Sequence, residues 1–290
     1  MNRNEETITS REDLSGLAQF SFDHADHYCN EQHGCAPYHK AWSFLRLFER
    51  GGALPKGEDF YREELKSVVE RGGKRVLLSG SADTGLMALV SKVFKEFDVT
   101  PELTLVDRCR TVIEQNKLFA DSMNLNVHFF VGDIQDFRAE PFDVIIAHSF
   151  MLFFPQDELN VLASAWRSLL KENGLVLSTD ILTLSPDPVL PGEVTGEQIE
   201  NKLASVTKAA EDFGMDKIAI AELRRCLRLM HTELRRSSKS QVLSLSKMSD
   251  SMRSGGLEVL RTSTREHRGV FSTFEGSDVG NFRTVLGTLK

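Results

Sequence analysis

The sequence has few cysteines and no long apolar run. Its 290 residues include four cysteines, Cys29, Cys35, Cys109 and Cys226, and no two of them form a Cys-x-x-Cys pair. This number is too small for a disulfide framework, so we expect free thiols in a reducing compartment. No stretch reaches the roughly 20 apolar residues that a membrane span needs, and the polar start, residues 1–7, does not resemble a secretory signal. We therefore expect a cytoplasmic protein with no membrane partner.

An excess of positive charge is also missing. There are 35 basic and 42 acidic residues, which gives a net charge of −7. Nucleic-acid substrates usually select a basic surface, so we expect no nucleic-acid partner. The hydrophobic content of 41% is enough for a sizeable core, in one large domain or two small ones.

The middle of the chain alternates apolar strands with amphipathic helices. The expected strands of this region cover residues 75–79, 103–107, 127–131, 142–147 and 175–179. Alternation of this kind is typical of a doubly wound, mostly parallel sheet in an α/β protein. Asn173-Gly174 should turn the chain into the fifth strand, and a helix should cover 243–255. Two further strands, 257–264 and 268–274, share a short link that forbids a parallel crossover, so we expect a seven-stranded sheet with an antiparallel last strand.

Two helical regions flank this alternation. Residues 1–72 read as an N-terminal helical lid, and residues 73–290 as a Rossmann-like domain with a helical insertion at 184–240. In the insertion, the spacing from Thr195 to Gln198 predicts a capping box, and Gly214 should end the helix that it opens. We expect the insertion to pack over the sheet edge where the parallel strands end.

Small and acidic residues follow the first three expected strands. The first strand runs into Gly80-Ser-Ala-Asp-Thr-Gly85, Asp107 comes 22 residues after Gly85, and Asp133 comes 26 residues later. Because parallel strands end at one edge, this pattern predicts an adenosine-containing cofactor across that edge. The glycine loop alone would also fit a degenerate dinucleotide fingerprint, so an NAD-dependent oxidoreductase stays an alternative.

Together with Leu169-Leu-Lys-Glu-Asn-Gly-Leu-Val-Leu-Ser178, these motifs resemble the class I S-adenosylmethionine-dependent methyltransferases. The resemblance covers roughly 75–182 and 243–276. It implies S-adenosyl-L-methionine as cofactor and S-adenosyl-L-homocysteine as product, with Asp107 on the ribose hydroxyls and Asp133 on the adenine amine. The cofactor-binding residues that it implies are Gly80, Ser81, Ala82, Gly85, Asp107, Arg108, Asp133, Ile134 and His148.

The sequence departs from this family at the first strand. The family usually has an acid at the end of that strand, whereas this chain has Leu78 and Ser79 there, and Ala82 replaces the middle glycine. Asp83 either supplies the missing acid or caps the following helix. The departure keeps open a non-catalytic cofactor-binding subunit.

His148 is the candidate general base. Methyl transfer from a sulfonium is an in-line displacement in which the protein mainly aligns the reactants, and a base is needed only if the acceptor must lose a proton. His148 lies at the end of the fourth strand, and the unperturbed pKa of a histidine is near neutrality. His148 could instead shape the loop through a hydrogen bond. Phe150, Met151, Phe153 and Phe154 follow and could form an apolar wall for the acceptor or belong to the core.

A second group of polar side chains lies before the first strand. Its members are His24, His27, Cys29, His33, Cys35 and His39. Imidazole and thiolate suit zinc, but the spacing resembles no known zinc module, so we favour a lid over the acceptor and assign no metal. The expected substrate-binding residues are Tyr28, Tyr38, His39, Trp42, Phe150 and Met151.

These features predict methyl transfer to a small molecule, such as a specialised metabolite. The arginines of a late helix, Arg224, Arg228 and Arg235, form a solvated face or, alternatively, an anchor for an anionic substrate. An apolar face of the helical caps could equally cover a homodimer interface.

Overall fold

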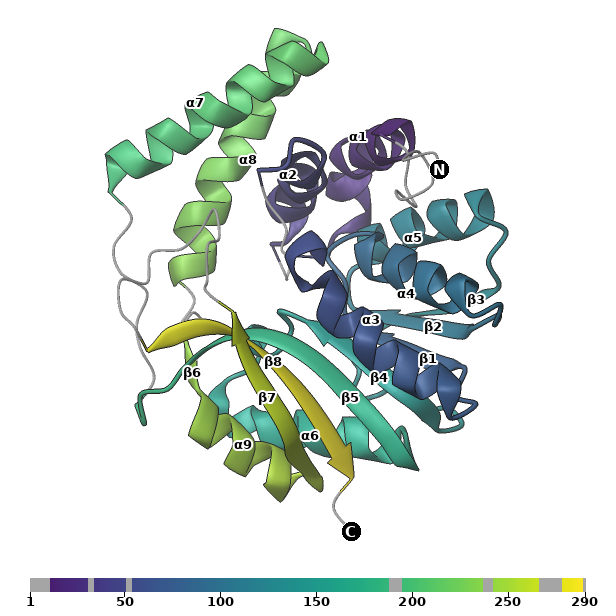
Figure 1. The fold of residues 1–290 in the computed structure, drawn as a ribbon. Coiled ribbons are helices and arrows are strands. Elements are labelled where there is room, and N and C mark those ends of the chain that lie inside the picture. The colour runs from purple at the N-terminus through teal and green to yellow at the C-terminus, as the bar shows by residue number, and fades with distance from the viewer. Residues whose placement is uncertain are drawn as a thin grey trace.

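A computed structural model describes residues 11–30, 34–50, 54–187, 195–236, 242–265 and 278–288. The described strands form one mixed sheet in the order β3-β2-β1-β4-β5-β8-β7, with β6 paired to β5 (Figure 1). Their bounds are β1 Arg75–Ser79, β2 Glu102–Asp107, β3 Val127–Val131, β4 Phe142–His148, β5 Leu170–Thr183, β6 Leu243–Ser244, β7 Leu257–Arg265 and β8 Val279–Thr288. Strands β1 to β5 pair in parallel, whereas β8 is antiparallel to both β5 and β7. The doubly wound, mostly parallel sheet with an antiparallel closing strand is therefore confirmed.

Helices cover both faces of this sheet (Figure 1). Those of the described residues are α1 Arg11–Tyr28, α2 Ala36–Leu47, α3 Leu54–Glu70, α4 Gly85–Glu96, α5 Arg110–Ser122, η2 Met151–Phe153, η3 Gln156–Glu158, α6 Leu159–Ser168, α7 Gly196–Phe213, α8 Lys217–Arg236 and α9 Leu245–Ser254. Helices α3, α4 and α5 pack on one face and α6 and α9 on the other, so each face has its own apolar core. Strand β1 is buried between them: Leu78 points into the first core and Leu77 into the second.

A third apolar core joins segments that are far apart in sequence. Phe22 of α1 and Phe44 of α2 pack with Leu203 of α7 and Leu227 of α8. The apolar stripes of the late helices are thus covered by the N-terminal helices (Figure 1). The capping box at Thr195 and Gln198 is present, and Gly214, with φ +91°, ends α7, as predicted. The division into a lid, a domain and an insertion remains a prediction.

The described strands differ from the expected ones at two places. The expected strand at 268–274 lies outside the described residues, and the last described strand is β8, which begins eleven residues after the expected start. The turn predicted at Asn173-Gly174 is absent because β5 already begins at Leu170. Between the pairs Phe142–Leu170 and Val144–Leu175 the register shifts, so the extra residues of β5 form a bulge within the sheet.

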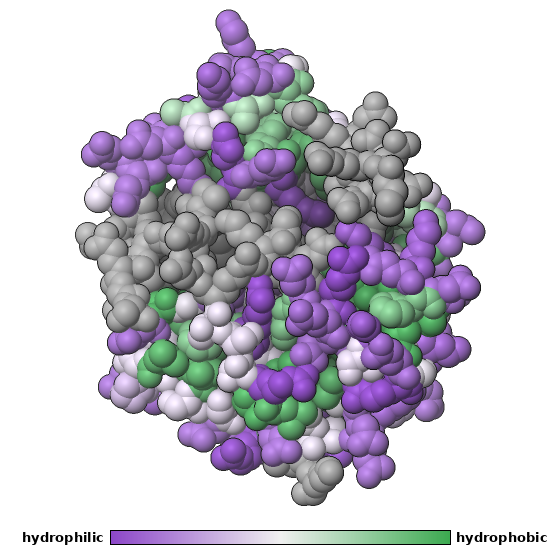
Figure 2. Space-filling model, in the orientation of Figure 1, coloured by the Kyte–Doolittle hydropathy of each residue, from purple (hydrophilic) through white to green (hydrophobic). Residues whose placement is uncertain are grey.

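The coloured part of the face drawn in Figure 2 is mainly polar. Figure 2 shows a largely hydrophilic face on which the hydrophobic areas are separate from one another. None of the helices in the described part of the chain has both the length and the apolar character needed to cross a membrane.

Candidate active site

The loop after β1 has a conformation that requires glycine. Gly80 has φ +76°, a region that side chains with a Cβ rarely adopt. A Cβ at this position would lie 2.4 Å from Cδ2 of Phe150, because the Phe150 ring packs directly against Gly80. This glycine thus has a packing role as well as the cofactor role that the sequence predicts.

Asp107, at the end of β2, is bonded to this loop. Its Oδ2 accepts a hydrogen bond from the Ser81 backbone N–H at 2.9 Å, and its Oδ1 accepts one from the Cys109 N–H at 2.7 Å. The two bonds fix the orientation of the carboxylate and leave lone pairs on both oxygens for further donors. Burial raises the pKa of Asp107 to about 6, against the lowering effect of these two donors. Asp107, which the sequence predicts to bind the ribose, is therefore in contact with the glycine loop.

Asp133 occupies the equivalent place after β3. Its Oδ1 accepts the Gln135 backbone N–H at 3.0 Å, which holds the carboxylate in a local turn. Arg108, just after β2, brings Nη1 within 3.6 Å of Asp133 Oδ2. Ile134 is buried beside it, with 3% of its surface exposed. The predicted adenine-side residues are thus brought together next to Asp107.

Asp83, the candidate for the missing acid, is bonded through both of its carboxylate oxygens. Its Oδ1 accepts from the Gly85 N–H and from Nη1 of Arg46, both at 2.7 Å, and its Oδ2 accepts from Nε1 of Trp42 at 3.0 Å. The carboxylate therefore caps the start of α4 and ties α2 to the glycine loop. Ser79 Oγ accepts from the buried indole of Trp166 at 2.9 Å.

The end of β4 carries a histidine–tyrosine pair. Nδ1 of His148 lies 3.0 Å from the hydroxyl of Tyr61, and that hydroxyl is also within 3.3 Å of the Ala147 carbonyl oxygen. Burial lowers the pKa of His148 to about 4, so its imidazole is neutral at physiological pH. Burial also raises the pKa of Tyr61, which keeps the phenol protonated.

The apolar residues after β4 divide between the core and the surface. Met151 is fully buried, and its N–H donates to Oδ1 of Asp180 at 3.1 Å. Phe150 is half-buried and packs against Phe154 and Trp166, whereas Phe153 is 41% exposed. Met151 therefore has a packing role, and an acceptor-binding role for it and Phe150 remains a prediction.

The predicted lid aromatics lie at different distances from this edge. Tyr38 stacks on Trp42 with a centroid distance of 5.3 Å, and its pKa is raised by burial and by the charges of Asp83 and Asp107. Both rings of α2 are therefore close to the glycine loop. Tyr28 instead packs under the guanidinium of Arg110, 5.2 Å from its ring centroid.

The histidine and cysteine cluster is only partly brought together. His24 hydrogen-bonds the Phe20 carbonyl on the exposed side of α1, and His33 lies outside the described residues. Cys29, Cys35 and His39 do converge, and Cys109, which follows Asp107, joins them. Cys109 was not predicted to take part in this cluster.

The late arginines make ion pairs with neighbouring helices. Arg224 Nη1 donates to Thr207 Oγ1 at 2.8 Å, and Arg228 Nη2 donates to Glu200 Oε1 at 2.8 Å. These pairs link α8 to α7 and favour the interpretation as a solvated face. The side chain of Arg235 lies outside the described residues.

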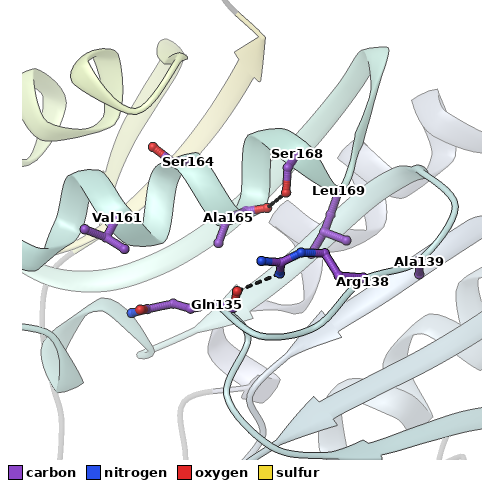
Figure 3. A pocket seen from close by; sticks show the side chains of 8 residues that line it. All are labelled: Gln135, Arg138, Ala139, Val161, Ser164, Ala165, Ser168 and Leu169. Atoms are coloured by element: carbon purple, nitrogen blue, oxygen red, sulfur yellow. Dashed lines mark hydrogen bonds between the residues drawn. The ribbon is translucent and has the colours of Figure 1, made fainter.

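A groove separate from the candidate site lies on the face of the sheet that α6 covers. It has a volume of about 390 Å³ and lies between α6 and the loop after β3 (Figure 3). In Figure 3 one wall of the groove is the outward side of α6 around Ser164 and Ala165, and the opposite wall is Arg138, which donates to the Gln135 carbonyl. The residues of the candidate site do not line this groove.

Sequence reasoning missed Tyr61, Arg46 and Cys109 at this edge. Tyr61 and Arg46 lie in the N-terminal region that the sequence predicts to be helical, but each meets its partner through a tertiary contact: 87 residues separate Tyr61 from His148 and 37 separate Arg46 from Asp83. Cys109 directly precedes α5 and comes two residues after Asp107. This position, next to a strand that ends in an acid, is the one feature of the sequence that could have indicated it.

Comparison with known proteins identifies the type of domain. Residues 85–174 match a protein family described as "Methyltransferase domain". The chain is similar in structure to a putative sarcosine dimethylglycine methyltransferase from Galdieria sulphuraria, with 13% identity, 80% of this chain and 84% of that one covered, and a TM-score of 0.50. It is also similar to an S-adenosylmethionine-dependent methyltransferase from Clostridium acetobutylicum ATCC 824, with 11% identity, 85% and 96% covered, and a TM-score of 0.51. At these identities the two structures show the fold. No curated protein sequence matches the chain significantly.

Proposed function

Because the chain contains a class I S-adenosylmethionine-dependent methyltransferase domain, we propose that it methylates a small-molecule acceptor held beneath its N-terminal helices. The observation that carries the proposal is the Asp107 carboxylate, which is fixed by Ser81 and Cys109 at the edge where β1 to β4 end. This is the position at which such folds hold an adenosine ribose.

The described residues fit the adenosine end of the cofactor. Asp107 offers acceptors for the ribose hydroxyls, and Asp133 with Ile134 lies next to it for the adenine. At the methionine end the contacts differ from the usual pattern, since Leu78 is fully buried and Asp83 is bonded to Arg46 and Trp42. Gly80, Ser81, Ala82 and Gly85 would present backbone there. When bound, the cofactor supplies a methyl group on a sulfonium that is already a good leaving group.

His148 is suited to take a proton from the acceptor. With the Tyr61 hydroxyl donating to the Ala147 carbonyl, Nδ1–H of His148 donates to the Tyr61 oxygen. This tautomer leaves the lone pair on Nε2, the nitrogen that can accept a proton. Tyr61 is therefore a positioning residue for the imidazole. The low pKa keeps the imidazole neutral, and an acceptor that loses no proton would need only alignment.

The surroundings of the site favour a small acceptor. Tyr38 and Trp42 of α2 lie near the glycine loop, and α2 is tied to this loop through Asp83. Helix α8 in turn packs on α2, with Lys40 bridging to Glu222 at 3.0 Å. These helices leave less room for a macromolecule than an open sheet edge would, and the net charge of −7 does not favour nucleic acid. The family match favours methyl transfer over an NAD-dependent oxidoreductase.

The test is acceptor-dependent formation of S-adenosyl-L-homocysteine. Purified protein would be incubated with S-adenosyl-L-methionine and panels of small amines, phenols, thiols and carboxylic acids, in parallel with unrelated proteins and RNA. Mass spectrometry would follow the cofactor product and the methylated acceptor. We expect turnover with members of a small-molecule panel. Turnover with protein or RNA acceptors alone would overturn the proposed acceptor class.

A further inference from the structure

Three cysteines and one histidine meet in a cluster beside the candidate active site. The members are Cys29, Cys35, His39 and Cys109, and their ligand atoms all lie within 4.8 Å of one another. Cys29 follows the end of α1, Cys35 directly precedes α2, His39 lies in the first turn of α2, and Cys109 directly precedes α5. The cluster therefore joins the N-terminal helices to the methyltransferase domain (Figure 1).

The distances fit a shared metal better than a disulfide. The Sγ atoms of Cys29 and Cys109 are 3.5 Å apart, and those of Cys35 and Cys109 are 3.7 Å apart. Four ligands around Zn²⁺ at Zn–S distances of about 2.3 Å place neighbouring sulfurs about 3.8 Å apart. A disulfide would use two of the thiols and leave the third thiol and the imidazole buried without a shared partner. A tetrahedral ion would use all four donors.

The surroundings of the four side chains are those of a metal site that is mostly closed to solvent. His39 and Cys109 are buried, with 7% and 8% of their surfaces exposed, and Cys29 and Cys35 are half-buried. Cys35 and His39 are four residues apart, and the His39 N–H bonds to the Cys35 carbonyl at 3.1 Å, so both project from one face of α2. Thr111 Oγ1 lies 3.2 Å from Cys29 Sγ and can donate to a thiolate there.

Helix ends also favour thiolates at this place. Cys35 and Cys109 are the residues that precede the first turns of α2 and α5. The positive ends of the two helix dipoles therefore lie next to the cluster and stabilise negative charge on these sulfurs.

We propose that Cys29, Cys35, His39 and Cys109 form a structural Zn²⁺ site that fastens the N-terminal helices to the methyltransferase domain. Binding replaces the three thiol protons, which leave to solvent, with one ion held by three thiolates and a neutral imidazole. Three of the ligands come from the N-terminal helices and the fourth comes from the residue whose backbone N–H orients Asp107. The ion would thus hold the end of α1 and the start of α2 next to Asp107 without taking part in the reaction.

The metal content of the full-length protein tests this proposal. The protein would be purified without an affinity tag that binds metal and without chelator, and analysed by inductively coupled plasma mass spectrometry. We expect one zinc per chain, and loss of that zinc in Cys109→Ser and Cys29→Ser. Cys226→Ser is the matched control, because Cys226 is a buried cysteine of α8 outside the cluster, and it should keep the zinc.

Two further measurements keep the test independent of folding defects in the variants. His39→Cys should retain zinc, since it offers a four-thiolate set at the same place. Wild-type protein loaded with Co²⁺ should show the visible and near-ultraviolet bands of tetrahedral cobalt thiolate. Absence of zinc together with absence of these bands would overturn the proposal. A wild-type mass lower by two thiol hydrogens, with Cys109 cross-linked to Cys29 or Cys35, would overturn it in favour of a disulfide.

Discussion

The hydroxyl of Tyr61 lies 3.0 Å from Nδ1 of His148, and this contact joins α3 to the end of β4. Tyr61 is fully buried, so its phenol fixes the imidazole from the core side of the sheet. The arrangement engages one histidine nitrogen with the protein, and we propose that the other faces the acceptor. It connects the helix before the first strand with the residue proposed to accept a proton.

The pH dependence of turnover tests the protonation state of His148. Only the neutral imidazole can accept a proton, and burial lowers the His148 pKa to about 4. With S-adenosyl-L-methionine at saturation, so that titration of Asp107 near pH 6 does not limit binding, kcat should therefore stay constant from neutral pH down to about pH 5 and fall as the pH approaches 4. A fall centred near about pH 6.5, the ordinary histidine pKa, would contradict this assignment.

Substitutions separate the base from its positioning residue. His148→Ala should lower kcat far more than it changes the affinity for S-adenosyl-L-methionine, because the proposed ribose and adenine contacts are made by Asp107 and Asp133. Tyr61→Phe keeps the ring in the core but removes the hydroxyl, so kcat should fall less and the acidic limb of the pH profile should move. Unchanged kcat in both variants would leave His148 with a purely structural role.

Asp107 should carry much of the affinity for the adenosine part of the cofactor. Asp107→Ala removes the acceptors for the ribose hydroxyls, and leaving such groups unpaired costs about 1–3 kcal/mol, or about 5–150-fold in Kd. Calorimetric titration with S-adenosyl-L-homocysteine measures the change. Asp121→Ala, at an exposed acid near the end of α5, is the matched control and should bind like the wild type. Wild-type affinity in a folded Asp107→Ala protein would refute the ribose assignment.

Gly80→Ala should destabilise the protein through contact with Phe150. The new Cβ would meet the ring at 2.4 Å, and φ +76° adds backbone strain, so we expect a loss of about 2–4 kcal/mol in the free energy of unfolding. In a Phe150→Ala background the steric part should disappear, and the same substitution should cost only about 1–2 kcal/mol. Gly196→Ala, which has open space around the new methyl group, should change stability by less than about 0.5 kcal/mol. Urea unfolding of the four variants measures these differences, and equal costs of Gly80→Ala in both backgrounds would argue against the packing role.

The connection between α2 and the glycine loop should depend on Asp83. Asp83→Ala leaves the Arg46 guanidinium, which is 17% exposed, and the Trp42 indole without their acceptor. Breaking a mainly buried pair in this way costs about 3–5 kcal/mol of stability. Lys74→Ala breaks a pair with Glu102 whose side chains are 55% and 44% exposed, so it should cost less than about 1 kcal/mol. Similar midpoints of unfolding for the two variants would show that Asp83 does not anchor α2.

The strands and the strand-end acids could be predicted because their signals are local. Strands β1, β2 and β4 are mostly buried apolar runs. Asp107 ends β2, and Asp133 follows the half-exposed β3 after Gly132. The position of β8 could not be predicted in this way, since it contains two glycines; Gly287 allows Leu260 of β7 to approach within 2.7 Å of where a Cβ would lie. The pairs Tyr61–His148 and Cys29–Cys109 are 87 and 80 residues apart and depend on how helices pack on the sheet. A single sequence contains no direct signal for such contacts.

The measurement that tests the central claim most directly is parallel calorimetric titration of the purified protein. S-adenosyl-L-methionine, S-adenosyl-L-homocysteine and NAD(H) would be titrated under the same conditions. Micromolar binding of the first two and none of NAD(H) is the predicted result, and it would support the roles of Asp107 and Asp133. Binding of NAD(H) alone would contradict the account and make the loop from Gly80 to Gly85 a dinucleotide-binding loop.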